Sequence, residues 1–214
     1  MGALWYIATT TRPVITAAVY ILCRSVGKPC QRNWNAVKEV IRYLKQSADL
    51  TLKMSAHSKL QLIGYLDADW AGDTTNRKST GGYSFKLGDS SISWSSRKQM
   101  SVALSSTEAE CTSAAYASQE TIWLRQLLDE LGEPARCPTK LYEDNQGCIK
   151  LAASEKINAR TKHIDIRHHH LRDLVENDVI ELVYCETDKM VAEAMTKSIP
   201  APRFKELRIE MRRC

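Results

Sequence analysis

The spacing of hydrophobic residues changes near residue 59. Before that point apolar residues recur at helical spacing, and one stretch places four of them on a single stripe: Trp34, Val37, Ile41 and Leu44. This pattern predicts an amphipathic helix packed on another surface. From Lys59 the alternation becomes that of a strand ending at Asp67. We therefore expect a helical segment over residues 1–58, a separate domain over 59–200, and a C-terminal helix or tail over 201–214.

A long helix is predicted after residue 105. Ser105 is a favourable N-cap, Glu108 follows it in capping-box register, and Gly132 is placed to end the helix. The face expected to be buried carries Glu110, Ala114, Ala117, Leu124, Leu128 and Leu131. Small residues on that face would let the helix approach a sheet closely.

The other elements alternate between strands and helices. Extended runs are predicted at 83–87 and 91–96, joined by a turn with hairpin chemistry at 88–90. Later elements are expected at 141–144 (strand), 145–153 (helix), 161–176 (helix), 180–185 (strand) and 192–195 (helix). This order predicts an α/β fold with a mixed five-stranded sheet flanked by helices.

Three carboxylates stand where a predicted strand or helix meets a turn: Asp67, Glu110 and Asp144. Acids that are distant in sequence but placed at element ends can converge in one cluster. Converging anions repel each other strongly unless cations hold them. The three positions therefore indicate magnesium chemistry.

The composition narrows the class of protein. The chain has 214 residues, with 30 Lys and Arg against 25 Asp and Glu, a mild excess that suits a polyanion or an ordinary soluble surface equally well. The seven cysteines are scattered without metal-type pairing, which indicates free thiols in a reducing compartment. No apolar stretch has the length or flanks of a membrane anchor or a signal peptide. We expect a protein of the cytoplasm or nucleus that is not secreted.

Five motifs follow one another in the order found in a known family: 67–73, 77–83, 105–110, 142–146 and 161–167. Together they resemble the ribonuclease H domain of copia-type retrotransposon polyproteins, from about Leu60 to Leu207. The N-terminal part, including residues 4–13 and 43–45, resembles the end of the adjoining reverse transcriptase. The Asp-Asp motif of that polymerase is missing, so no DNA synthesis is expected from this chain.

The resemblance implies a ribonuclease H-like fold that hydrolyses the RNA strand of RNA/DNA hybrids. In that family four carboxylates hold two Mg²⁺ ions, typically ~4 Å apart, and Mn²⁺ can replace them. Asp67, Glu110 and Asp144 match the first three acids, with Asp69 as the alternative to Asp67. Glu193 stands where the family usually has Asp, and its extra methylene would reduce activity if it displaced the ligand by ~1 Å.

The same resemblance suggests how a hybrid is bound. Gln146 is similar to the family residue that reaches the minor groove. Ser95, Ser96 and Asn145 are candidates for hydrogen bonds to 2′-hydroxyl groups, although strand-end and turn chemistry explains them equally well. Three pairs of basic residues either follow the phosphates of a bound nucleic acid or are solvated: Arg97-Lys98, Arg160-Lys162 and Arg167-Arg172. Tyr184 to Ala192 lacks the mobile-loop histidine of cellular enzymes, and His163 is the candidate substitute or simply a helix-start residue.

Three hypotheses remain open from the sequence. The first is a magnesium-dependent ribonuclease H, acting within a virus-like particle if it belongs to an active element, with the rest of a Pol polyprotein as partner. The second is a nucleic-acid-binding module of the same fold that has lost catalysis through Glu193 and truncation. The third is a non-functional remnant whose N-terminal helices lack a packing partner, in which case deleting them would cure poor solubility. Three adjacent histidines, 168–170, are expected on a solvated helix face, and three aromatic residues in the core: Trp94, Trp123 and Tyr142.

Overall fold

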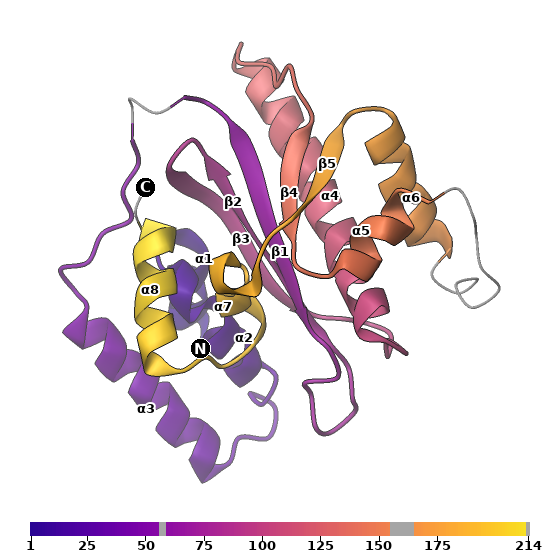
Figure 1. Cartoon of the computed structure of the whole chain (residues 1–214). Coiled ribbons are helices and arrows are strands. Elements are labelled where there is room, and N and C mark those ends of the chain that lie inside the picture. Colours follow the sequence, from indigo (N-terminus) through magenta and orange to yellow (C-terminus); the bar gives the residue numbers. More distant parts are fainter. Residues whose placement is uncertain (56–58, 155–164, 213–214) are drawn as a thin grey trace.

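A mixed five-stranded sheet forms the centre of the computed structural model, which describes residues 1–55, 59–154 and 165–212 (Figure 1). The strand order is β3-β2-β1-β4-β5. The first three strands form antiparallel pairs, whereas β4 runs parallel to β1 and to β5. Their bounds are β1 Leu62–Asp69, β2 Thr80–Leu87, β3 Ser90–Lys98, β4 Thr139–Glu143 and β5 Ile180–Tyr184. Because β1 and β4 are parallel neighbours, their C-terminal ends meet at the same edge of the sheet.

The helices lie on both faces of this sheet (Figure 1). One side carries α4 Ser106–Glu130, α5 Gln146–Ala152 and α6 Asp165–Glu176. The other side carries α1 Gly2–Thr10, η1 Pro13–Ile15, α2 Thr16–Cys23, α3 Gln31–Gln46, α7 Glu193–Thr196 and α8 Ala201–Arg212, and the short η3 Thr187–Lys189 follows β5. The predicted α/β class and the mixed five-stranded sheet are confirmed.

Alternating side chains of the strands build a separate core on each face. Leu62 and Leu66 of β1 pack with Phe85 and the small residues of α4 on one face. Tyr65, between them in sequence, packs on the other face with α7 and the N-terminal helices. The tight approach of α4 follows from its alanines, since Ala114 and Ala117 are fully buried.

The N-terminal helices share a hydrophobic core with the C-terminal end of the chain. Leu4, Val14 and Val19 pack with Met195 and Leu207. Two hydrogen bonds join the same segment to β3: Trp94 donates its indole N–H to the Ala8 carbonyl at 2.8 Å, and the Lys98 backbone N–H donates to the Tyr20 hydroxyl at 3.1 Å. The segment therefore has a packing partner within this chain, which opposes the idea of an unpacked remnant.

The buried side of α3 is rotated from the stripe expected from its sequence. Trp34 and Ile41 are 56% and 48% exposed, and the residues that contact the core are Val37, Val40, Tyr43 and Leu44. Both arrangements give a helical stripe of apolar residues, and only the position of the neighbouring helices decides between them.

The limits of α4 follow the capping signals. The Ser105 hydroxyl accepts the Glu108 backbone N–H at 3.1 Å, and the Glu108 carboxylate accepts the Leu104 backbone N–H at 2.7 Å. Gly132 ends the helix with φ of 82°, a conformation that favours glycine. Leu131, beyond the last helical residue, is exposed rather than part of the buried face.

One aromatic prediction and one histidine prediction differ from the structure. Trp94 and Tyr142 pack as expected, whereas Trp123 lies on the outer side of α4 and is exposed. His168 is buried, with a ring nitrogen against the Leu151 carbonyl, because α6 packs this position against α5.

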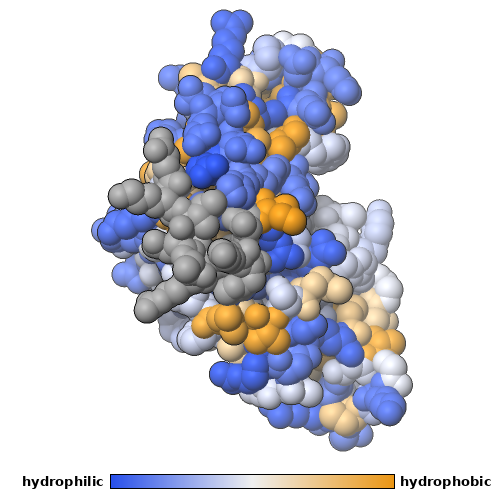
Figure 2. Space-filling view, turned by 90° about the vertical axis from the view of Figure 1, so that its right-hand side faces the viewer, coloured by the Kyte–Doolittle hydropathy of each residue, from blue (hydrophilic) through white to orange (hydrophobic). Residues whose placement is uncertain are grey.

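In the described ranges no helix has both the length and the apolar character needed to cross a membrane. Figure 2 shows that the surface beside α5 and α6 is mostly hydrophilic, with hydrophobic areas that are small and separated.

Candidate metal centre

Three carboxylates from three elements meet at the edge where β1 and β4 end. Oxygen atoms of Asp67, Glu110 and Asp144 lie within 4.8 Å of one another. Asp67 is near the end of β1, Asp144 directly follows β4, and Glu110 reaches the same edge from the second turn of α4. Asp67 and Glu110 are buried, and Asp144 is partly exposed. The trio expected from the sequence is therefore brought together.

Asp67 is held by the segment around α7. Its carboxylate accepts a hydrogen bond from the Thr196 hydroxyl and lies 4.0 Å from the Lys197 ammonium group. Burial raises the pKa of Asp67, whereas Lys197 and Thr196 act in the opposite direction. The other acids, Asp144 and Glu193, raise that pKa further. A bound cation would favour the ionised form of this carboxylate.

Glu110 carries an unused buried acceptor. One of its carboxylate oxygens, Oε2, has no hydrogen-bond partner among the described residues. A hydrogen bond from the Ala68 backbone N–H favours the ionised form of Glu110. Burial, followed by the charges of Glu143, Asp67 and Asp144, raises the pKa of Glu110 to about 11. An all-oxygen set with a buried vacant acceptor suits a hard cation such as Mg²⁺ or Mn²⁺.

Glu143 is a further buried acid that the sequence analysis did not single out. Its side chain is fully buried, one oxygen accepts the Asn145 backbone N–H at 2.8 Å, and the other has no partner in the described part of the chain. Burial raises the pKa of Glu143 well above its ordinary value. Alternation along β4 was the available signal, because Glu143 has the same parity as the core residue Leu141.

Glu193 lies close to the three acids without joining their group. Its carboxylate is 3.1 Å from the Arg203 guanidinium group and 3.5 Å from the Lys197 ammonium group. Since Lys197 also approaches Asp67, the Lys197 ammonium group is shared between Glu193 and Asp67. Asp69 is turned elsewhere: a Cβ added to Gly72 would lie 1.7 Å from Asp69 Oδ2, so this carboxylate packs on the loop after β1.

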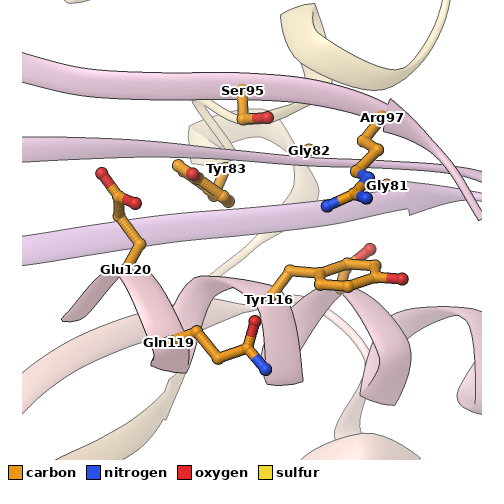
Figure 3. A pocket seen from close by; sticks show the side chains of 9 residues that line it. Gly81, Gly82, Tyr83, Ser95, Arg97, Tyr116, Gln119 and Glu120 are labelled. Carbon is orange, nitrogen blue, oxygen red and sulfur yellow. The ribbon is translucent and has the colours of Figure 1, made fainter. Parts of the chain in front are cut away.

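The residues expected to bind substrate lie in three different settings. Ser95 and Arg97 line a cavity of about 250 Å³ between β2, β3 and α4 (Figure 3). Ser96, on the other face of β3, is buried. Asn145 caps α5 by accepting the Cys148 backbone N–H at 3.0 Å, and Gln146 is exposed beside Asp144. His163, Arg160 and Lys162 lie outside the described residues.

The pKa of Glu110 predicts a pH-dependent stability in the absence of metal. Its pKa rises from 4.5 to about 11 on folding, so the folded protein holds a proton that the unfolded chain releases. The stabilising effect is complete below the ordinary pKa and is lost as the pH rises toward the raised one. We expect the melting temperature in EDTA to fall between mildly acidic and alkaline pH, and to fall less in Glu110→Gln.

Thermal unfolding followed by circular dichroism across this pH range measures the effect. Glu133→Gln, which changes an exposed acid, is the matched control and should follow the wild-type curve. Equal slopes for wild type and Glu110→Gln would contradict the prediction.

Known proteins are similar in sequence to this chain over nearly its whole length. No family model matches it. The chain is 39% identical over 204 residues to the retrovirus-related Pol polyprotein from transposon TNT 1-94 of Nicotiana tabacum, and 40% identical over 204 residues to that from transposon RE2 of Arabidopsis thaliana. Both matches cover 95% of this chain but only 15% and 14% of the relatives, so the chain spans about one seventh of their length.

A solved structure of LC11-RNase H1 in complex with an RNA/DNA hybrid is also similar. The match has 12% sequence identity and a TM-score of 0.47, and covers 64% of this chain and 94% of that chain.

Proposed function

We propose that this chain hydrolyses the RNA strand of RNA/DNA hybrids with divalent metal ions. It belongs to the Pol polyproteins of copia-type LTR retrotransposons, and its fold is a mixed five-stranded sheet flanked by helices. The observation that supports this most is the meeting of Asp67, Glu110 and Asp144 within 4.8 Å. The rest of a Pol polyprotein is the proposed partner, since the relatives are much longer than this chain.

The three carboxylates are the proposed ligands of two Mg²⁺ ions. Bound there, the metal pair supplies activation of the attacking water and stabilisation of the leaving 3′ oxygen. Thr196 and Lys197 hold the Asp67 carboxylate in place, and the Thr187 hydroxyl donates to Asp144 Oδ2 at 2.9 Å. These contacts fix the ligand oxygens before substrate arrives, which lowers the cost of ordering them during reaction.

Glu193 is the proposed fourth ligand. It is linked to the trio through Lys197, and its hydrogen bond to Arg203 holds it outside the three-acid group. This ion pair favours a second candidate function, a nucleic-acid-binding module with weak or no cleavage, because a ligand engaged by arginine is less available to a cation.

The candidate residues for substrate contact differ in how exposed they are, and we assign the proposed contacts from that exposure. Gln146 is exposed beside Asp144, where it would reach the minor groove of a hybrid. The Asn145 side-chain oxygen is engaged in capping α5, which leaves its amide N–H groups for a 2′-hydroxyl. Ser95 and Arg97 are open to a cavity, whereas Ser96 is the one of this set that the structure buries.

A metal-dependent cleavage assay tests the proposal. We expect the purified protein to cut the labelled RNA strand of a hybrid in Mg²⁺ or Mn²⁺, to stop in EDTA, and to leave the DNA strand, single-stranded RNA and duplex DNA intact. Asp144→Asn, purified in parallel, should be inactive and so excludes a contaminating nuclease. Hybrid binding without cleavage would reject the enzyme and support the binding module.

A further inference from the structure

Two arginines from distant elements approach a single aromatic ring on α4. The guanidinium carbon of Arg97, on β3, lies 5.2 Å from the centre of the Tyr116 ring, and that of Arg167, on α6, lies 5.8 Å from the same centre. Figure 3 shows the Arg97 guanidinium group beside the Tyr116 ring at one end of the cavity. Each cation is attracted to the ring, but the two positive charges repel each other.

Neither arginine is paired with a carboxylate in the described part of the chain. The acid that lines the cavity, Glu120, accepts a hydrogen bond from the Ser93 hydroxyl at 2.5 Å and another from the Tyr83 hydroxyl. Neither Arg97 nor Arg167 forms a salt bridge with a described residue, and Arg97 is exposed. Arg167 donates one hydrogen bond to the Thr112 hydroxyl at 3.3 Å, and its other N–H groups, with those of Arg97, are available to an anion.

The cavity lined by Arg97 and Tyr116 adds hydroxyl groups, and Arg167 approaches it through the Tyr116 ring. Ser113 is 2% exposed, and its hydroxyl has no hydrogen-bond partner among the described residues. A Cβ on Gly81 would lie 2.2 Å from that hydroxyl, so the glycine leaves the space that the hydroxyl occupies. Ser95 lines the same cavity, where its hydroxyl forms a hydrogen bond with that of Tyr83 and keeps capacity for a second one. Guanidinium and hydroxyl groups together form the donor set that phosphate prefers.

We propose that Arg97 and Arg167, with the Ser95 and Ser113 hydroxyls, bind a backbone phosphate of the RNA/DNA hybrid. The inference rests on the proposed function, because the ligand is the same hybrid. Ser113 follows Glu110 by three residues on α4, so the phosphate site is one helical turn from the carboxylate trio. The site holds the duplex by its charge and supplies affinity rather than chemistry.

The dependence of hybrid affinity on salt measures this contact. Binding of a fluorescent hybrid is followed by anisotropy in an Asp144→Asn background, which prevents cleavage. Each phosphate contact contributes about one unit to the slope of log affinity against log salt. Because both arginines contact the same phosphate, we expect the double variant to lower the slope by about one unit. Arg97→Gln and Arg167→Gln should each lower it by part of that unit, with several-fold weaker binding at moderate salt.

Two further variants separate binding from folding. Arg136→Gln removes an exposed charge beyond the other end of α4 and should leave the slope unchanged. Arg97→Lys keeps the charge, and should keep the slope while losing affinity through the missing bidentate geometry. An unchanged slope in Arg97→Gln and Arg167→Gln, with unchanged melting temperature, would overturn the site.

Cleavage by the wild-type protein distinguishes this failure from that of the proposed function. Normal cleavage with unchanged slopes rejects the phosphate site alone. Lowered slopes without wild-type cleavage reject the enzyme and keep the phosphate site.

Discussion

Replacing Asp67 with asparagine is expected to lower hybrid cleavage by about 10³-fold, because a metal ligand supplies several kcal/mol of charge stabilisation. The amide keeps the shape of the side chain and removes its negative charge. The fold should not suffer, since the same change removes repulsion from two neighbouring acids. We therefore expect a melting temperature in EDTA equal to or above that of the wild type.

Single-turnover cleavage of a saturating hybrid is the appropriate measurement. Asp129→Asn, which changes an exposed acid at the other end of α4, is the matched control and should retain full activity. Activity of Asp67→Asn within about tenfold of the wild type would show that Asp67 is not a required ligand.

Deleting residues 1–58 is expected to abolish cooperative unfolding. The deletion removes Leu4, Val14 and Val19 from a core that they share with Met195 and Leu207. It would expose the face of the sheet that carries Tyr65 and Trp94, and exposed apolar surface of this kind promotes aggregation. The effect also reaches the site, since the same packing positions α7, which holds Asp67 through Thr196.

Matched valine substitutions test the same packing without a deletion. Val19→Ala, at a fully buried position, should lower the free energy of unfolding by about 2 kcal/mol. Val26→Ala, at a position that is 54% exposed, should change it little. A fragment of residues 59–214 that unfolds at the wild-type temperature would contradict this role for the N-terminal segment.

Local signals explain what could be predicted from the sequence. The limits of α4 were predictable because Ser105 and Gly132 act on their immediate neighbours. The trio was predictable because each acid lies near the end of an element, and local residues determine the type and the limits of that element. The side of α3 that is buried, and the burial of His168, depend on which helix packs against them, and spacing along one helix carries no such information.

The surroundings of the fourth acid show the same limit. The methylene that distinguishes Glu193 from aspartate is visible in the sequence, but its pairing with Arg203 arises from the position of α8. The motif around residue 144 marks Asp144 and not Glu143, whereas the burial of Glu143 follows from its alternation with Leu141 along β4.

The position of bound metal tests the central claim most directly. Crystals soaked in Mn²⁺ and measured at its absorption edge would locate the ions by anomalous scattering. We expect anomalous peaks in contact with Asp67, Glu110 and Asp144 together, with Glu193 turned from Arg203 if it is the fourth ligand. Ions bound elsewhere, with these three carboxylates left without metal, would contradict the assignment of the trio as a metal centre.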